Sequence, residues 1–331
     1  MRIGIDVSYA VNEPTGVGRY SFELVKALIA VDRTNEYWLY ANFFRNRAAK
    51  TRKLAELTQK KRNVRLVVTH LPGQVKDWLF WAAPGVVKGW FPPLDIFHAL
   101  TFQAAGPFAK KNVLTIHDLS YFENPGWYGG EANFYQNQTK RAYQLSHLVI
   151  VPSKTTVVAV SRFLGGKKPV RVIPEGVAER FFAQKLKSSK AQKLNILAVG
   201  SGPRKNIDDV AKLLPITQLT RASDEELLKA YRKATVLVYP SLSEGFGLPV
   251  LEAMAAGVPV VTSKNSAMAE FANGGALLIN PRDPREIAAA VKRILNDPKL
   301  ATKLSHEGQR IAKTYPWSRA ARGTLKAYRL A

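Results

Sequence analysis

The chain has 331 residues, of which 46% are hydrophobic, and its formal net charge is +24. This length predicts two domains, and the apolar content excludes a chain that is disordered throughout. The lack of cysteine excludes disulfide frameworks and thiolate chemistry. No run of about 18 uncharged apolar residues is present, and residues 1–7 lack the apolar core of a signal peptide, so we expect a cytoplasmic protein.

The excess of Lys and Arg favours an anionic partner, because a positive field concentrates anions at a protein surface. Nucleic acid, anionic lipid and phosphorylated small molecules compete for this role with a merely basic, solvated surface. The densest block, residues 45–65, contains nine basic residues and the single acid Glu56. It holds no zinc-ligand set and no ribonucleoprotein-type aromatic motif, so nucleic acid is the least favoured partner.

In the first half of the chain, short β-branched runs alternate with helical patterns, an order typical of a parallel sheet with helices on both faces. The predicted strands are residues 3–7, 64–69, 95–99, 113–117, 148–152 and 170–173. The predicted helices include residues 17–30, 131–144 and 154–163. Together these elements predict a Rossmann-like α/β domain over residues 1–178.

A polar, basic segment at residues 179–193 predicts a linker, after which the alternation restarts. The predicted strands are residues 195–199, 216–219, 236–239, 258–262 and 276–279. The predicted helices are residues 224–233, with a capping box from Ser223 to Glu226, then 249–256, 285–296 and a segment from 298 onward. We therefore expect a second Rossmann-like domain over residues 194–313. In residues 314–331 a new helix is expected after Pro316, packing back on the first domain.

The segment most informative about function is residues 241–252, SLSEGFGLPVLE. A predicted strand ends there in a loop with Gly245 and Gly247, and a helix follows at once. Ligands bind at the carboxyl ends of parallel strands, and both a glycine backbone and a helix N-terminus suit an anion. Glu244 and Glu252 add two carboxylates, which accept hydrogen bonds from sugar hydroxyls. The alternative is that Glu244 is an exposed loop residue and that Glu252 only favours the first turn of its helix.

This segment resembles the E-x7-E motif of the retaining glycosyltransferases of family 4, which have the GT-B fold of two facing Rossmann-like domains. The resemblance implies that residues 1–178 form the acceptor-binding domain and that residues 194–313 form a shortened nucleotide-sugar-binding domain. The resemblance implies that Glu244 binds donor-sugar hydroxyls as a catalytic residue and that Glu252 binds the nucleotide ribose. It also implies that the backbone of Phe246, Gly247 and Leu248 holds the sugar and the diphosphate.

Two further motifs carry the same resemblance. Residues 15–20, TGVGRY, resemble the family's glycine-rich loop, which assigns donor binding to Gly16. Residues 115–119, TIHDL, resemble the strand end that places a catalytic histidine, here His117, at the donor sugar. Together with residues 203–206, PRKN, these motifs most resemble the mannosyltransferase-like branch of the family.

The PRKN motif follows a predicted strand with two cations, Arg204 and Lys205. Cations at this place suit a diphosphate, because fixed positive groups stabilise the negative charge of the departing group. The family carries a Lys that matches Lys205; its frequent Arg lies earlier and is absent here, so we expect Arg204 to substitute for it. The alternative is a solvated basic turn. No Asp-x-Asp motif is present, so we expect no metal ion.

The chain departs from the family pattern at residues 207–215. The family has a helix, a strand and another helix there, whereas this chain passes directly to the predicted strand at residue 216. A parallel crossover needs roughly a dozen residues or more, so about one β-α unit is missing. Residues 218–221 would ordinarily help to form the nucleobase pocket. The residues alone leave open whether the chain is an active shortened transferase or a degenerate copy.

These observations favour a retaining hexosyltransferase of polysaccharide biosynthesis that needs no cofactor. The expected donor is GDP-mannose or a UDP-sugar, and the expected acceptor is a glycan or a lipid-linked glycan. The alternative is a catalytically degenerate GT-B protein that binds membranes or partner enzymes.

The basic block at residues 45–65 and the aromatic cluster WLFW at residues 78–81 also predict peripheral docking on the inner face of an anionic membrane. The alternative is a solvated basic block beside an aromatic cluster that is buried between helix and sheet.

Overall fold

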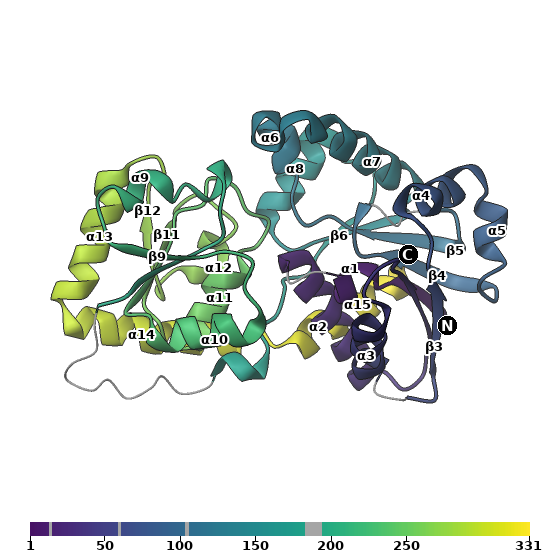
Figure 1. The fold of residues 1–331 in the computed structure, drawn as a ribbon, viewed down its shortest axis with the longest axis horizontal. Coiled ribbons are helices and arrows are strands. Elements are labelled where there is room, and N and C mark those ends of the chain that lie inside the picture. The colour runs from purple at the N-terminus through teal and green to yellow at the C-terminus, as the bar shows by residue number, and fades with distance from the viewer. Residues whose placement is uncertain (13–14, 59–60, 103–105, 183–193) are drawn as a thin grey trace. The chain divides into compact units, whose positions relative to one another are not determined.

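The computed structural model describes residues 1–12, 15–58, 61–102, 106–182 and 194–331. The chain forms two compact α/β units, and helices cover both faces of each parallel sheet, as predicted (Figure 1). Unit 1 comprises Met1–Pro152, Thr156–Pro174 and Trp317–Ala331, and unit 2 comprises Ser153–Thr155 and Glu175–Pro316. Along the described part of the chain, no helix is both long and apolar enough to cross a membrane.

Unit 1 contains a seven-stranded parallel sheet in the order β3-β2-β1-β4-β5-β6-β7. The strands are β1 (Arg2–Asp6), β2 (Glu36–Asn42), β3 (Val64–Thr69), β4 (Leu94–Ala99), β5 (Ala109–Thr115), β6 (Leu148–Val151) and β7 (Val170–Val172). The inner strands are buried on both faces because helices cover them, which is why their sequences are nearly continuous apolar runs. The strand order reverses between β1 and β4, and ligands of open parallel sheets bind at such a switch point.

Helices and short 3-10 turns connect these strands. They are α1 (Ser8–Asn12), α2 (Gly16–Val31), α3 (Arg47–Thr58), α4 (Gly73–Ala82), α5 (Pro84–Lys88), α6 (Ser120–Glu123), η2 (Pro125–Glu131), α7 (Ala132–Leu145), α8 (Lys154–Leu164) and α15 (Trp317–Leu330). The first turn of α2 is capped by Thr15, whose hydroxyl accepts from the Gly18 N–H at 3.1 Å. This cap fixes the start of α2 next to the switch point of the sheet.

The C-terminal helix α15 packs against α2 within unit 1 (Figure 1). A buried hydrogen bond of 2.7 Å joins Tyr328 Oη of α15 to Nδ1 of His98 on β4. The other ring nitrogen, Nε2, pairs with Thr115 Oγ1 at 2.8 Å. Burial, with a smaller contribution from His117, lowers the pKa of His98 to about 3, so its imidazole is neutral at physiological pH. The helix is thus tied to the sheet by a polar bond as well as by apolar packing.

Unit 2 contains a five-stranded parallel sheet in the order β12-β11-β10-β8-β9. The strands are β8 (Ile196–Val199), β9 (Ile216–Leu219), β10 (Val236–Tyr239), β11 (Val260–Ser263) and β12 (Leu277–Ile279). The connecting elements are η3 (Glu179–Phe182), η4 (Pro203–Lys205), α9 (Asp208–Ala211), α10 (Asp224–Lys233), α11 (Leu248–Ala255), α12 (Ala269–Ala272), α13 (Pro284–Asn296) and α14 (Pro298–Lys313). The capping box predicted for α10 is present, with Ser223 and Glu226 bonded reciprocally.

The connection from β8 to β9 is unusually short for a parallel crossover. Residues 200–215 make it, and their one α-helix, α9, spans Asp208–Ala211. Val210 of α9 is fully buried, so this single turn still covers the sheet. Strand β9 pairs with β8 over four residues, Ile196–Val199 with Ile216–Leu219, and forms the edge of the sheet.

The predicted linker at residues 179–193 lies mostly outside the described residues, which omit 183–193. Its first part is η3, where Phe181 is 1% exposed and packs against the ring of Tyr231 at 6.0 Å. These four residues therefore belong to the core of unit 2.

Candidate active site

In unit 2, the strand order reverses between β8 and β10, so the loops that follow these strands lie on either side of a switch point. The loop after β8 carries the PRKN motif, and the loop after β10 carries Glu244. Two contacts hold the loops together: the Arg204 carbonyl accepts from Leu242 N at 2.9 Å, and Ser241 Oγ lies 3.1 Å from the same carbonyl oxygen. The cations and the carboxylate predicted from the sequence thus meet at the edge where a ligand is expected.

The backbone of the second loop is fixed by Gly247, which precedes α11 with φ +102°. A Cβ atom at this position would lie 2.5 Å from Met268 Cγ, so both the torsion and the packing require glycine. Phe246 is 5% exposed and packs on Phe271 at 4.9 Å, and Leu248 is equally buried. No side chain caps the N-terminus of α11. The side chains of Phe246 and Leu248 therefore point into the core, and only their backbone suits ligand binding.

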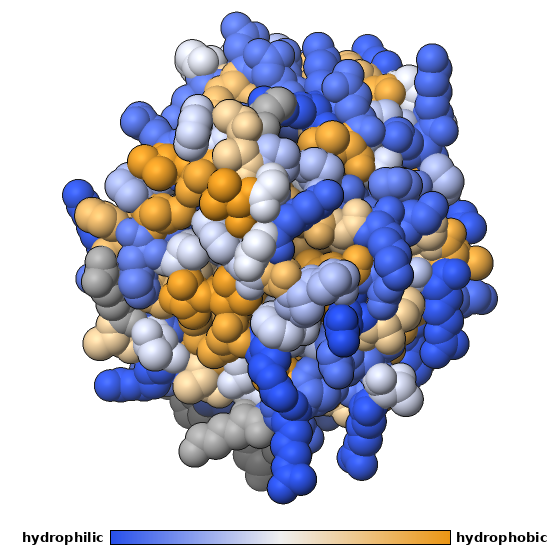
Figure 2. All heavy atoms as spheres, turned by 90° about the vertical axis from the view of Figure 1, so that its right-hand side faces the viewer, coloured by the Kyte–Doolittle hydropathy of each residue, from blue (hydrophilic) through white to orange (hydrophobic). Residues whose placement is uncertain are grey.

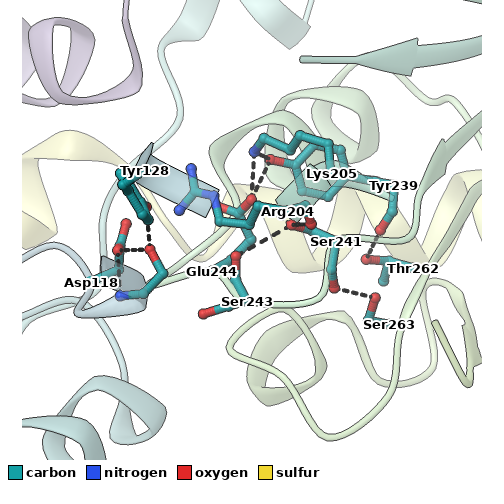
Figure 3. A network of polar contacts seen from close by, with 11 residues as sticks. Asp118, Tyr128, Arg204, Lys205, Tyr239, Ser241, Ser243, Glu244, Thr262 and Ser263 are labelled. Atoms are coloured by element: carbon teal, nitrogen blue, oxygen red, sulfur yellow. Dashed lines mark hydrogen bonds and ion pairs between the residues drawn. The ribbon is translucent and has the colours of Figure 1, made fainter. Parts of the chain in front are cut away.

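The centre of the site is an ion pair between Lys205 and Glu244 (Figure 3). The Glu244 carboxylate also accepts from Ser241 Oγ at 2.8 Å and from Tyr239 Oη at 3.1 Å. The Lys205 ammonium lies 4.6 Å from the ring centroid of Tyr239 and donates to its hydroxyl. The Glu244 side chain is only 10% exposed and that of Lys205 15%, so Glu244 is not an exposed loop residue.

Burial and neighbouring charges shift the pKa of Glu244 in opposite directions. Burial raises the pKa of its carboxyl, but the cations of Lys205 and Arg204 and the hydrogen bonds from Lys205 and Ser241 outweigh this effect. The net result is a pKa below the ordinary value, so Glu244 is ionised at neutral pH. Burial raises the pKa of the adjacent Tyr239 hydroxyl well above its ordinary value, which keeps it a neutral donor.

The loop after β8 is shaped around Lys205. Gly200 has φ +98°, and a Cβ there would lie 2.9 Å from Lys205 Cε. The lysine stem therefore runs across the glycine before its ammonium reaches Glu244. Arg204, the neighbouring cation, is half-buried. The predicted pair of cations is thus present at the carboxyl end of β8.

Glu252, the second carboxylate of the motif, lies on α11 and is 1% exposed. Its Oε2 accepts from Tyr231 Oη of α10 at 3.0 Å, and the same hydroxyl lies 3.3 Å from the Pro249 carbonyl. Glu252 is thus more than a residue that favours the first helical turn, because it joins α11 to α10. Its predicted role toward ribose stays a prediction.

Residues 218–221, predicted to help form a nucleobase pocket, lie at the end of the edge strand β9. Gln218 Nε2 donates to the Gly200 carbonyl at 2.8 Å, which links this segment to the loop carrying Lys205. Arg221 is exposed and has φ +50°. The short crossover therefore still brings this segment beside the cation-bearing loop.

Unit 1 carries the two remaining predicted residues, Gly16 and His117. Gly16 begins α2, and a Cβ there would meet no atom within 4 Å. His117 follows β5, and its Nε2 lies 3.1 Å from the Leu100 carbonyl, so this nitrogen carries a proton and donates. Tyr20 packs edge-on against the imidazole at 4.5 Å and lies 3.3 Å from Thr115 Oγ1. His117 is thus held in one orientation.

Several polar residues of these sites were missed from the sequence. They are Tyr231, Tyr239 and Ser241 in unit 2, and Asp118, Ser120 and Tyr128 in unit 1. Tyr239 and Ser241 flank the end of β10, so their place at a strand terminus was a usable signal. Among the described residues, no group of three or more His, Asp or Glu side chains is arranged to hold a metal ion.

The sequence matches two protein families. It matches Glycosyltransferase Family 4 over residues 14–180, half of the chain, and Glycosyl transferases group 1 over residues 156–297. It is 28% identical over 240 residues to the MMP alpha-(1->4)-mannosyltransferase of Mycolicibacterium hassiacum, which covers 61% of this chain and 57% of the relative. The chain spans about a third to just over half of the length of the first curated relatives it matches.

Solved structures resemble the chain over its full length. Sucrose-phosphate synthase from Thermosynechococcus elongatus has a TM-score of 0.75 at 19% identity, covering 100% of this chain and 98% of that one. Anabaena Alr3699/HepE in complex with UDP-glucose has a TM-score of 0.71 at 18% identity, covering 99% and 100%. At these identities the likeness shows the fold alone. The family match and the two parallel sheets agree: the chain belongs to glycosyltransferase family 4 and has the GT-B fold.

Proposed function

We propose that the chain is a retaining hexosyltransferase that moves mannose or a similar hexose from a nucleoside diphosphate sugar to a glycan or lipid-linked glycan. The observation that carries the proposal is the buried Lys205–Glu244 pair at the switch point between β8 and β10. A mannosyltransferase among the relatives and a UDP-glucose complex among the structural neighbours support it.

The pair suggests how donor binding proceeds. An incoming diphosphate competes with Glu244 for the Lys205 ammonium, because phosphate oxygens accept charge-assisted hydrogen bonds from lysine. As the ammonium turns to the phosphate, Glu244 becomes available to sugar hydroxyls. Arg204 and the uncapped N-terminus of α11 add positive potential for the charge that develops as the glycosidic bond breaks.

The remaining roles follow from the resemblance. Glu252 would bind the ribose, the backbone at residues 246–248 would hold the sugar and diphosphate, and Gly16 and His117 would act on the donor from unit 1. The donor is proposed to be GDP-mannose or a UDP-sugar. The acceptor would attack on the face from which the diphosphate leaves, so the anomeric configuration is retained.

The proposal is tested by calorimetric titration of the protein with GDP-mannose, UDP-glucose and UDP-galactose, followed by turnover assays with the donor that binds. Binding of one donor with release of its nucleoside diphosphate in the presence of a glycan acceptor would support an active transferase. The short β8–β9 crossover is the observation that favours the rival, a degenerate binder. Binding without turnover, or no binding at all, would favour that rival.

We further propose that transfer needs no metal ion, since Arg204, Lys205 and the α11 N-terminus supply the positive charge. Adding EDTA is then expected to leave the initial rate unchanged. The rate is measured by nucleoside diphosphate release, with and without chelator. A complete loss that Mn²⁺ restores would contradict this assignment.

The aromatic cluster of the predicted membrane surface is partly exposed and partly buried. Trp78 is 61% exposed, whereas Phe80 is 3% exposed and packs edge-on against Phe108 at 4.7 Å, so the aromatic cluster at residues 78–81 is partly core. Other exposed apolar side chains of unit 1 are Phe44, Leu66, Val68, Val75 and Val86. Figure 2 shows apolar side chains gathered among hydrophilic ones on the side of the molecule where α4, α5 and β3 lie.

We propose that unit 1 docks on anionic lipid through the basic block at residues 45–65, together with the exposed side chain of Trp78. Each Lys or Arg near an anionic surface contributes about 1 kcal/mol. The triple change Arg52→Glu, Lys61→Glu and Arg62→Glu is therefore expected to abolish co-sedimentation with phosphatidylserine vesicles. The matched control makes the same charge change at exposed lysines of unit 2: Lys292, Lys299 and Lys303.

High salt should release the wild-type protein from these vesicles, because the Debye length falls to about 3 Å at 1 M. Neutral phosphatidylcholine vesicles should bind little. Equal binding to both vesicle types, or an equal loss of vesicle binding in both triple variants, would contradict the docking proposal. The positive charge would then be explained by soluble anionic substrates.

A further inference from the structure

The C-terminal helix α15 reaches the rest of unit 1 through two buried aromatic side chains. Trp317 begins the helix and is 7% exposed, and Tyr328 lies near its end and is 2% exposed. Trp317 packs on the ring of Tyr20 from α2, with the ring centroids 5.8 Å apart. The Tyr328 hydroxyl lies 2.7 Å from Nδ1 of His98 on β4. Helix α15 thus holds one side chain of α2 and one side chain of the sheet.

A series of hydrogen-bonding contacts leads from His98 to Tyr20. Nε2 of His98 lies 2.8 Å from Thr115 Oγ1 on β5, and the same hydroxyl lies 3.3 Å from Tyr20 Oη. Burial lowers the pKa of His98 to about 3, so its imidazole is neutral and one ring nitrogen donates while the other accepts. The two contacts of this ring are therefore coupled, and loss of the Tyr328 hydroxyl also weakens the contact with Thr115. Tyr20 is thus held twice by α15, once at its ring and once at its hydroxyl.

Tyr20 in turn packs against His117, which follows β5. The two rings meet edge to face with their centroids 4.5 Å apart, and Nε2 of His117 lies 3.1 Å from the Leu100 carbonyl. Tyr20 is 3% exposed, whereas His117 is half-buried and lines a cavity of about 210 Å³ in unit 1. The imidazole of His117 is therefore the point at which a buried set of side chains meets space that a ligand can enter.

We infer that the C-terminal helix positions the imidazole of His117, with Trp317 and Tyr328 as its two points of contact. Both residues act through Tyr20, so they are positioning residues of the site. The inference rests on the proposed function, because the role of His117 toward the donor is taken from there. It predicts that substitutions on α15 change sugar transfer through His117.

The test is NMR spectroscopy of the histidine rings in the full chain, which has five histidines. Each ring signal is assigned by substituting one histidine at a time. Tyr328→Phe removes the hydroxyl and keeps the ring, and Trp317→Phe shortens the side chain that packs on Tyr20. Both variants are expected to shift or broaden the ring signals of His117, with no donor or acceptor present.

Thr324→Val is the matched control on the same helix. Thr324 is buried like Tyr328, but its hydroxyl donates at 2.9 Å to the Ala320 carbonyl of α15 itself. The control therefore also removes one buried hydroxyl, while the contacts with Tyr20 remain. The ring signals of His117 should stay as in the wild type. Thermal unfolding checks that all three variants are folded.

The rate of sugar transfer gives a second measurement, which separates positioning from a general loss of stability. Tyr328→Phe is expected to lower kcat about tenfold, because a small displacement of a catalytic group costs a large part of the rate. In the His117→Ala background the same change should cause no further loss. Two residues that act independently would instead lower kcat by the product of their separate effects.

Unchanged His117 signals in both α15 variants, or the same change of these signals in Thr324→Val, would overturn the inference. An equal loss of kcat from Tyr328→Phe in the wild-type and His117→Ala backgrounds would also overturn it. The NMR measurement needs no donor, so it decides the positioning of His117 even when the chain transfers no sugar. In that case the proposed function fails alone, whereas active transfer with unchanged His117 signals would refute the positioning alone.

Discussion

Glu244→Gln is expected to lower the turnover of sugar transfer about 100-fold or more, because the amide keeps the size of the side chain but loses its charge. Removing one preorganised electrostatic partner of a transition state typically lowers kcat by about 100-fold to 1000-fold. The measurement is kcat at saturating donor, with donor affinity determined separately by calorimetry. Loss of turnover with donor binding retained is the expected pattern.

The same substitution also affects folding. Lys205 is 15% exposed and would keep a buried charge without its carboxylate partner. Removing one member of a buried pair costs about 3–5 kcal/mol. Glu244→Ala is therefore a poor test of catalysis, because a buried ion-paired residue contributes to stability in a way that an exposed loop residue does not.

The double variant Lys205→Met with Glu244→Gln separates the two effects. It removes both charges and leaves no unpaired buried ion. Its free energy of unfolding should therefore be closer to that of the wild type than the value for Glu244→Gln alone, while sugar transfer stays lost. The pKa of Glu244 is below its ordinary value of 4.5, so the ion pair stabilises the wild type fully above that pH. This advantage should shrink as the pH falls through the lowered pKa. A single variant with near-normal kcat would refute the role of Glu244.

Gly247→Ala is expected to reduce donor binding more than tenfold and to destabilise unit 2 by about 3 kcal/mol. The φ of +102° strains any residue with a Cβ, and the added atom would overlap Met268 Cγ at 2.5 Å. Met268 is fully buried and has little room to move. The shift of the loop would displace the backbone that precedes α11. Calorimetry with the donor and thermal unfolding measure the two effects.

Gly202→Ala is the matched control. Gly202 has a similar φ of +90°, but a Cβ there meets nothing within 4 Å. Its substitution should cost only the torsional strain, about 1–2 kcal/mol, with donor binding less affected. If the two alanine variants behave alike, contact with Met268 plays no part and the packing argument fails.

Much of the fold follows from patterns in the sequence, but β2 and α3 show where such patterns fail. β2, EYWLYAN, is a buried inner strand without a single β-branched residue, so its run did not resemble the Val- and Ile-rich strands around it. α3 buries Leu54 and Leu57 but carries many basic residues, and two apolar positions make no clear stripe. Tertiary burial, which local propensity does not report, decides both elements.

The candidate site was predictable as far as a motif fixes the place of a residue along the chain. The motif placed Glu244 and Lys205 after two strands, and parallel strands bring such positions to one edge of the sheet. It could not show that the two form a buried ion pair. The pairing of Asp118, Ser120 and Tyr128 was hidden for another reason: Tyr128 lies in η2 (Pro125–Glu131), a 3-10 segment with no periodic pattern.

The return of α15 to unit 1 has a consequence for biosynthesis. A ribosome releases the N-terminal strands first, but Trp317 and Tyr328, which are buried in the core of unit 1, are made only after the whole of unit 2. Until then α2 lacks α15, its packing partner, and Nδ1 of His98 lacks the hydroxyl of Tyr328. Unit 1 therefore cannot complete its core before unit 2 has been synthesised. This differs from the usual order, in which the N-terminal domain folds first during synthesis.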